Sequence, residues 1–286
     1  MTKVIVFANQ KGGVAKTTSA IALAQSLALD GKRVLFFDLD PQENASNTLR
    51  LSQDVPNLYD LMTAPDDDEI IFQTCLQVVD DCKNITAIRG DIQLSAADLM
   101  FNRQGREYIV KERLEPHKND YDVVIMDTPP ALGVLTVNAL TSADSVIVPI
   151  SPDGYSLQGF YQLNENIRLI KKYSNPQLNI GGILVTRYVP NTIVSREIRE
   201  IAKQYAEMAG TKVYKSVIRQ TVMVSESISA QQGVVLFAPN STAGQDYRAF
   251  AREVSREELV KGGVDRGNEE AGLQQKHRRY VPDLER

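Results

Sequence analysis

Short, mostly apolar runs recur along the chain, and each gives way to a polar or turn-forming segment. The runs lie at residues 4–7, 34–37, 85–88, 123–126, 146–150, 179–185 and 213–218. An uninterrupted apolar run of so few residues is typical of strands covered on both faces, as in parallel sheets. Strands with one face exposed to solvent instead alternate apolar and polar residues. Between the runs, apolar residues at helical spacing predict helices, most clearly over 155–173 and 195–208. The pattern predicts an α/β fold, with a mostly parallel, twisted sheet and helices on both faces.

The C-terminal part of the pattern suggests where the domain ends. Residues 94–114 are expected to be mostly helical, and residues 244–260 to form the last helix. After that helix the chain turns polar, with few apolar side chains left to bury. Such a composition does not offset the entropy lost on ordering a chain. We therefore expect one domain over residues 1–262 and a disordered tail over residues 263–286.

Composition narrows the class of protein. The 286 residues carry a net charge of −4, so any contact with nucleic acid must come from a local basic patch. Cys75 and Cys82 suggest neither a disulfide framework nor a metal site, and they fit a reducing cytosol. No apolar run approaches the ~18 residues that a membrane-spanning helix needs. Because the first strand is predicted to begin almost at the N-terminus, we expect no signal peptide and a cytoplasmic protein.

A glycine-bearing loop between the first apolar run and the first helix is the strongest chemical signal. Strand, glycine loop and helix together form a phosphate cradle, because glycine lets backbone N–H groups approach phosphate oxygens and the helix N-terminus adds positive charge. Lys16 would reach the β- and γ-phosphates of a nucleotide, and the Thr17 hydroxyl would bind Mg²⁺. The predicted nucleotide-binding residues of this loop are Lys11, Gly12, Gly13, Val14, Ala15, Lys16, Thr17 and Thr18.

Aspartates follow two of the apolar runs. Asp38 and Asp40 come after the second run, and Asp127 comes after the run that ends at residue 126. Open α/β sheets bind ligands at the carboxyl ends of their strands, so these carboxylates are expected beside the phosphate loop. At such a position Asp127 can hold Mg²⁺ through water, which makes Thr17 and Asp127 the predicted metal residues.

The loop departs from the common phosphate-binding pattern, because Gln10 and Ala15 stand where glycine is usual. Its sequence motif, K-G-G-x-x-K-[ST] with Lys11 as the first lysine, resembles that of the ParA/MinD family of deviant Walker ATPases. The resemblance implies a P-loop NTPase fold, a requirement for ATP and Mg²⁺, and a homodimer in which Lys11 reaches the partner's nucleotide. Ala15 is a departure with a physical meaning, since alanine is disfavoured at positive φ.

The resemblance also implies roles for residues outside the loop. Asp40 would orient the attacking water, with Asp38 supporting the loop and the metal shell, so the implied catalytic residues are Lys11, Lys16 and Asp40. Thr186 and Arg187 follow a strand whose end lies near the adenine in this family.

Three segments look most like the short, Soj-like ParA partitioning group: residues 8–13, 38–42 and 127–130. MinD-like proteins end in an amphipathic membrane-binding helix, which Pro282 would break here, so we expect no membrane contact. Relatives of nitrogenase reductase need paired cysteines at positions that the two cysteines of this chain do not match.

Short ParA proteins bind double-stranded DNA without sequence preference, through basic residues in the C-terminal part of the chain. Arg219 falls near one DNA-contacting arginine of the family, whereas Met223 stands where a second arginine is usual. The expected DNA contacts are Arg219, Lys215, Arg196, Arg199 and Lys203.

The expected function is ATP-driven partitioning of a plasmid or chromosome. ATP-bound homodimers would associate with nucleoid DNA, and hydrolysis stimulated by a ParB-like centromere-binding protein would release them. An alternative remains open, in which the same nucleotide switch positions or regulates a protein cargo without segregating DNA.

Overall fold

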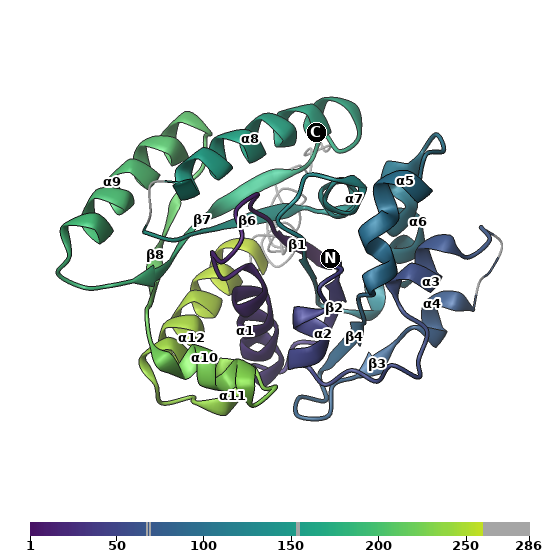
Figure 1. Ribbon diagram of the computed structural model, residues 1–286, viewed down its shortest axis with the longest axis horizontal. Coiled ribbons are helices and arrows are strands. Elements are labelled where there is room, and N and C mark those ends of the chain that lie inside the picture. Colours follow the sequence, from purple (N-terminus) through teal and green to yellow (C-terminus); the bar gives the residue numbers. More distant parts are fainter. Residues whose placement is uncertain (67, 69, 153–154, 260–286) are drawn as a thin grey trace, which may run out of the picture.

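One eight-stranded sheet runs through the described part of the chain (Figure 1). The computed structural model describes residues 1–66, 68, 70–152 and 155–259, so the predicted tail lies outside it. Along the sheet the strands follow the order β3-β4-β2-β5-β1-β6-β7-β8. Their bounds are β1 Lys3–Phe7, β2 Val34–Asp38, β3 Gln77–Val78, β4 Ile85–Ile88, β5 Val123–Asp127, β6 Ser145–Ile150, β7 Asn179–Tyr188 and β8 Val213–Arg219. Every neighbouring pair is parallel except β3 with β4, which places the carboxyl ends of seven strands at one edge.

Helices cover both faces of the sheet, as the sequence predicted. Within β1, Val4 and Val6 pack into one apolar core while Ile5 and Phe7 pack into the other. The second core contains α1 (Lys16–Leu29), α11 (Val234–Phe237) and α12 (Thr242–Val254), with α10 (Val222–Ser229) at its margin. The first core is covered by α3 Leu58–Thr63, α4 Ile71–Thr74, α5 Ala97–Met100, α6 Ile109–Leu114, α7 Val134–Ser142, α8 Tyr155–Tyr173 and α9 Ile193–Met208. The predicted α/β fold class is confirmed.

The segment 94–114, expected to be mostly helical, is instead broken into short pieces. Two 3₁₀ turns, Ile92–Ala96 and Arg106–Tyr108, alternate with α5 and α6. Gly105 at φ 80° interrupts the run, because a residue in the left-handed conformation cannot continue a right-handed helix.

The other predicted helices differ from the structure mainly at their ends. Helix α9 begins at Ile193, where the Thr192 hydroxyl caps it by accepting a hydrogen bond from Ser195 N. Helix α12 begins at Thr242 and ends at Val254, and a π-helical turn, Ser255–Leu259, continues it. The pattern did not predict α7, α10 and α11, nor the short α2 (Asn44–Thr48) and the 3₁₀ turn Glu115–Asp120.

Candidate functional site

The phosphate loop lies between β1 and α1, at the carboxyl edge of the sheet. Two of its residues adopt the left-handed conformation, Gly13 at φ 75° and Ala15 at φ 62° and ψ 36°. The Ala15 carbonyl already accepts a helical hydrogen bond from Ser19 N, at 3.0 Å. A Cβ placed on Gly12 would meet no described atom within 4 Å, so the rim of the loop is open. An open backbone at a helix N-terminus suits a phosphate.

Lys16 folds back over this loop. The residue is only 7% exposed, and its Nζ donates a hydrogen bond to the Lys11 carbonyl at 3.0 Å. Burial lowers the pKa of Lys16, while the carboxylates of Asp127 and Asp40 act in the opposite direction. The ammonium group is therefore close to both the loop and the aspartates, where the phosphates of a nucleotide would meet it.

Asn9 fixes the start of the loop, a role that the sequence reasoning missed. Its Nδ2 donates to the Pro149 carbonyl at 2.7 Å, and its Oδ1 accepts from Lys11 N at 3.0 Å. Helix α8 approaches so closely that a Cβ on Gly159 would lie 2.6 Å from Asn9 Oδ1. The available signal was an asparagine two residues before the loop, since asparagine commonly bonds the backbone two positions on.

Thr186 and Arg187 hold the other side of the loop. The buried Thr186 hydroxyl lies 3.1 Å from the Val14 carbonyl and 3.0 Å from the Ile150 carbonyl, and it has one proton to donate. Arg187 Nη1 donates to the Gly13 carbonyl at 3.1 Å. These contacts go to backbone, and both residues also line the cleft described below, so their contact with an adenine stays a prediction.

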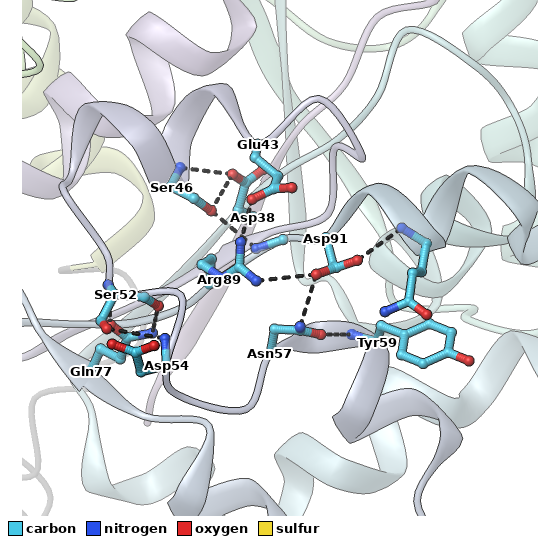
Figure 2. A network of polar contacts seen from close by, with 12 residues as sticks. Asp38, Glu43, Ser46, Ser52, Asp54, Asn57, Tyr59, Gln77, Arg89 and Asp91 are labelled. Carbon is cyan, nitrogen blue, oxygen red and sulfur yellow. Dashed lines mark hydrogen bonds and ion pairs between the residues drawn. The ribbon is translucent and has the colours of Figure 1, made fainter.

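Asp38 organises the chain that follows β2. This fully buried carboxylate accepts hydrogen bonds from Ser46 N at 2.8 Å and from Ser46 Oγ at 2.7 Å (Figure 2). It also accepts one from Asp40 N at 3.2 Å. Burial raises the pKa of Asp38 to about 6, although these donors oppose the shift. Asp38 thus ties the end of β2 to α2, and it leaves Asp40 at the border of the cleft.

Asp127 lies at the end of β5 and is fully buried. Neither of its oxygens has a hydrogen-bond partner of normal geometry among the described residues, although the Thr17 hydroxyl acts to lower its pKa. Burial, followed by the charge of Asp38, raises the pKa of Asp127 well above its ordinary value. Oxygen atoms are the ligands that Mg²⁺ prefers, so this carboxylate and the Thr17 hydroxyl fit the predicted metal.

A cleft of about 550 Å³ extends from the phosphate loop to the C-terminal helices. Its volume lies within the range of ~300–1,000 Å³ that is typical of small-molecule sites. The far wall contains Ile218, Arg219, Thr221, Val224, Ile228, Val234 and Tyr247. The Tyr247 hydroxyl lies 3.1 Å from Ser19 Oγ, which ties this wall to α1. The sequence reasoning missed the part of this wall that α10 and α11 form, because it predicted neither helix.

The basic residues expected to contact DNA lie mostly in contact with acidic or carbonyl groups. Arg219 binds both carboxylate oxygens of Asp246, at 2.9 and 2.7 Å, and its side chain is 39% exposed. Lys203 pairs with Glu200 at 2.7 Å. The remaining three are Arg196, Arg199 and Lys215, of which Arg199 Nη2 lies 3.5 Å from the Lys215 carbonyl. The structure therefore brings α9 and β8 together, and it places Arg219 at the nucleotide cleft.

Within the described ranges, no helix is long and apolar enough to cross a membrane.

Comparison with known proteins places this architecture in a family. A family model described as an AAA domain matches residues 2–180. The sporulation initiation inhibitor protein Soj of Bacillus subtilis is 39% identical over 258 residues, which cover 89% of this chain and 99% of Soj. The chromosome-partitioning ATPase Soj of Treponema pallidum is 35% identical over 255 residues, covering 89% of this chain and 97% of that protein.

A solved structure supports the same assignment. The crystal structure described as cobyrinic acid a,c-diamide synthase from Mycobacterium smegmatis, with bound ADP and magnesium, is 33% identical and superposes with a TM-score of 0.75. The match covers 90% of this chain and 95% of that one. Together with the deviant phosphate loop and the parallel sheet, these likenesses show that the chain belongs to the ParA/MinD family, as a ParA-like ATPase.

Proposed function

We propose that this protein is a DNA-partitioning ATPase that requires ATP and Mg²⁺. The observation that carries the proposal is the cleft, in which the glycine loop, Lys16 and Asp40 line one continuous space beside the buried Asp127. Relatives described as chromosome-partitioning proteins support the biological role, and the related structure that holds ADP and magnesium supports the ligands.

To hydrolyse ATP, a protein must position the reacting groups and stabilise the charge on the phosphates, and it does little covalent chemistry itself. The loop backbone and Lys16 would bind the phosphates, and Thr17 and Asp127 would hold Mg²⁺, which supplies further positive charge at the phosphates. Asp40, which borders the cleft, would orient the attacking water. Lys11, at the front of the loop, would act on the nucleotide of the partner in a homodimer.

The proposed cycle couples this chemistry to DNA. ATP would favour the dimer, and the dimer would bind double-stranded DNA through phosphate contacts on the α9, β8 and Arg219 side. Hydrolysis, stimulated by a ParB-like partner, would return the protein to a form with low DNA affinity. The protein would then be cytoplasmic and associated with the nucleoid when ATP is bound.

One observation favours a second candidate function, in which the switch carries a protein cargo. The ion pairs of Arg219 with Asp246 and of Lys203 with Glu200 reduce the positive charge that this side offers to DNA. A protein surface would need fewer unpaired cations than a phosphate backbone does.

Binding to random-sequence duplex DNA separates the two candidates. Affinity is measured with ATP, ADP or no nucleotide at two salt concentrations, for wild type, Lys16→Ala, Arg219→Ala and the matched control Arg168→Ala. Arg168 is an exposed arginine that pairs with Glu165 on α8, and it is not one of the proposed DNA contacts. ATPase assays with Mg²⁺ and with a chelator run in parallel.

The partitioning proposal expects binding only with ATP, normal binding by Arg168→Ala and loss of binding by Lys16→Ala. Arg219→Ala should reduce the slope of log affinity against log salt by about 1, the amount that one phosphate contact contributes. ATP-dependent dimers without DNA binding in any nucleotide state would instead support the protein-cargo candidate.

A further inference from the structure

A buried ion pair holds the chain that carries Asp40. Arg89, directly after β4, points its guanidinium at Glu43, which lies between β2 and α2 (Figure 2). The side chains of Arg89 and Glu43 are only 7% and 18% exposed. Because β4 and β2 are parallel neighbours, both residues come from the same edge of the sheet, next to the cleft.

Besides compensating charge, the ion pair holds Glu43 in an unusual backbone conformation. Glu43 adopts the left-handed conformation, with φ 54° and ψ 25°, which favours glycine and is strained for other residues. Its N–H donates to the Asp40 carbonyl at 2.9 Å, and its own carbonyl accepts from Asn47 N at 2.9 Å. One strained residue thus connects Asp40 to α2, and strain of this kind persists only where surrounding contacts enforce it.

Arg89 is itself anchored on the side away from Glu43. Its Nη2 donates to Asp91 Oδ2 at 3.1 Å, and the same oxygen accepts from Asn57 Nδ2 at 2.9 Å. Asn57 caps α3 through its Oδ1, which accepts from Tyr59 N at 2.8 Å. The guanidinium is therefore fixed by the capped end of a helix and is not free to follow Glu43.

Gly90, the residue after Arg89, packs closely against the segment from Asp38 to Ser46. Gly90 N donates to Ser46 Oγ at 3.0 Å, and a Cβ on Gly90 would lie 3.0 Å from the carbonyl oxygens of both Asp38 and Asp40. Residues 89–91 therefore pack against the segment from Asp38 to Ser46, and Arg89 also holds this segment through its ion pair with Glu43.

We propose that Arg89 is a positioning residue for ATP hydrolysis: through Glu43 it fixes the backbone that places the Asp40 carboxylate at the cleft. Neither Arg89 nor Glu43 is among the cleft-lining residues that the structure describes, so both act through Asp40 rather than on the nucleotide. The inference rests on the role of Asp40 in the proposed function.

The variants Arg89→Met, Glu43→Gly and the double variant test this proposal. Arg89→Met keeps an apolar stem but leaves the Glu43 carboxylate buried and unpaired, so the chain should leave its strained conformation. Glu43→Gly removes both the strain and the carboxylate, because glycine adopts positive φ unaided. Arg33→Met is the control. Arg33 pairs with Asp122 in a more exposed ion pair, at the amino ends of β2 and β5.

Three measurements are made on the full chain: kcat for Mg²⁺–ATP hydrolysis, affinity for a fluorescent ATP analogue, and hydrogen exchange of the amides of residues 41–47. Arg89→Met should lower kcat about tenfold or more, with affinity changed less than about threefold, because the phosphate loop is untouched. Exchange at residues 41–47 should quicken. Glu43→Gly should keep most of the activity, and adding Glu43→Gly to Arg89→Met should recover activity.

Several results would overturn the proposal. Unchanged kcat and exchange in Arg89→Met would show that the pair does not hold the chain. Equal losses of kcat and affinity, with lower thermal stability and no recovery in the double variant, would indicate a general structural role. A wild type that hydrolyses no ATP would contradict the proposed function, whereas the exchange measurement would still decide whether Arg89 fixes residues 41–47.

Discussion

Replacing Ala15 by glycine tests whether the phosphate loop stores backbone strain. Ala15 has φ 62° and ψ 36°, a conformation that costs a residue with a Cβ roughly 1–2 kcal/mol. Glycine removes this cost but adds freedom to the unfolded chain, which offsets about 0.4–1 kcal/mol. The net expectation is a stabilisation of about 1 kcal/mol, or about 2 °C in the melting temperature for a domain of this size.

Chemical and thermal unfolding of nucleotide-free protein measure this difference. Ala24→Gly is the matched control, because Ala24 is buried in the middle of α1, where the same substitution should cost about 1 kcal/mol or more. Opposite signs for the two variants would support the reasoning. Destabilisation of Ala15→Gly to the same extent as Ala24→Gly would refute it, because the left-handed conformation would then carry no cost.

Three further substitutions probe contacts around the cleft. Asp246→Asn removes the negative charge that pairs with Arg219, so ATP-dependent DNA affinity should rise about threefold or more if that arginine contacts phosphate; unchanged affinity would argue against the contact. Gly159→Ala places a Cβ 2.6 Å from Asn9 Oδ1 and should cost about 1–3 kcal/mol of unfolding free energy, together with weaker nucleotide binding; wild-type values would show that α8 can move aside. Thr186→Val removes a buried hydroxyl that lies within hydrogen-bond distance of the Val14 carbonyl in the loop and the Ile150 carbonyl at the end of β6, and it should lower stability by about 1–3 kcal/mol, whereas Thr186→Ser should lose less; equal losses would assign the effect to packing.

Seven of the eight strands could be predicted from the sequence because they coincide with short, mostly apolar runs, whereas the two-residue β3, Gln77–Val78, is too short to show a pattern. Alternate residues of β1 enter different cores, so both faces of the strand must be apolar. The sequence of such a strand is therefore an uninterrupted apolar run. The phosphate loop was predictable for a different reason: its function is encoded in adjacent residues, so no tertiary information is needed to find it.

The far wall of the cleft could not be predicted in the same way. It is formed by short helices whose apolar residues are too few to establish a helical period, and by a strand end that lies far along the chain. The pairing of Arg219 with Asp246 joins residues 27 positions apart, so a basic residue that looked available in the sequence is engaged in the fold. Similarly, the interruption of 94–114 depends on the left-handed backbone of Gly105.

The placement of β1 has a consequence for the order of events during synthesis. This strand is synthesised before the other seven strands of the sheet, yet its two neighbours are β5 and β6, more than a hundred residues later. The contact of Ser19 with Tyr247, which joins α1 to the far wall of the cleft, spans 228 positions. A ribosome-bound chain therefore contains the complete phosphate loop long before it can enclose a nucleotide. Nucleotide binding during translation should begin only when α12 has emerged.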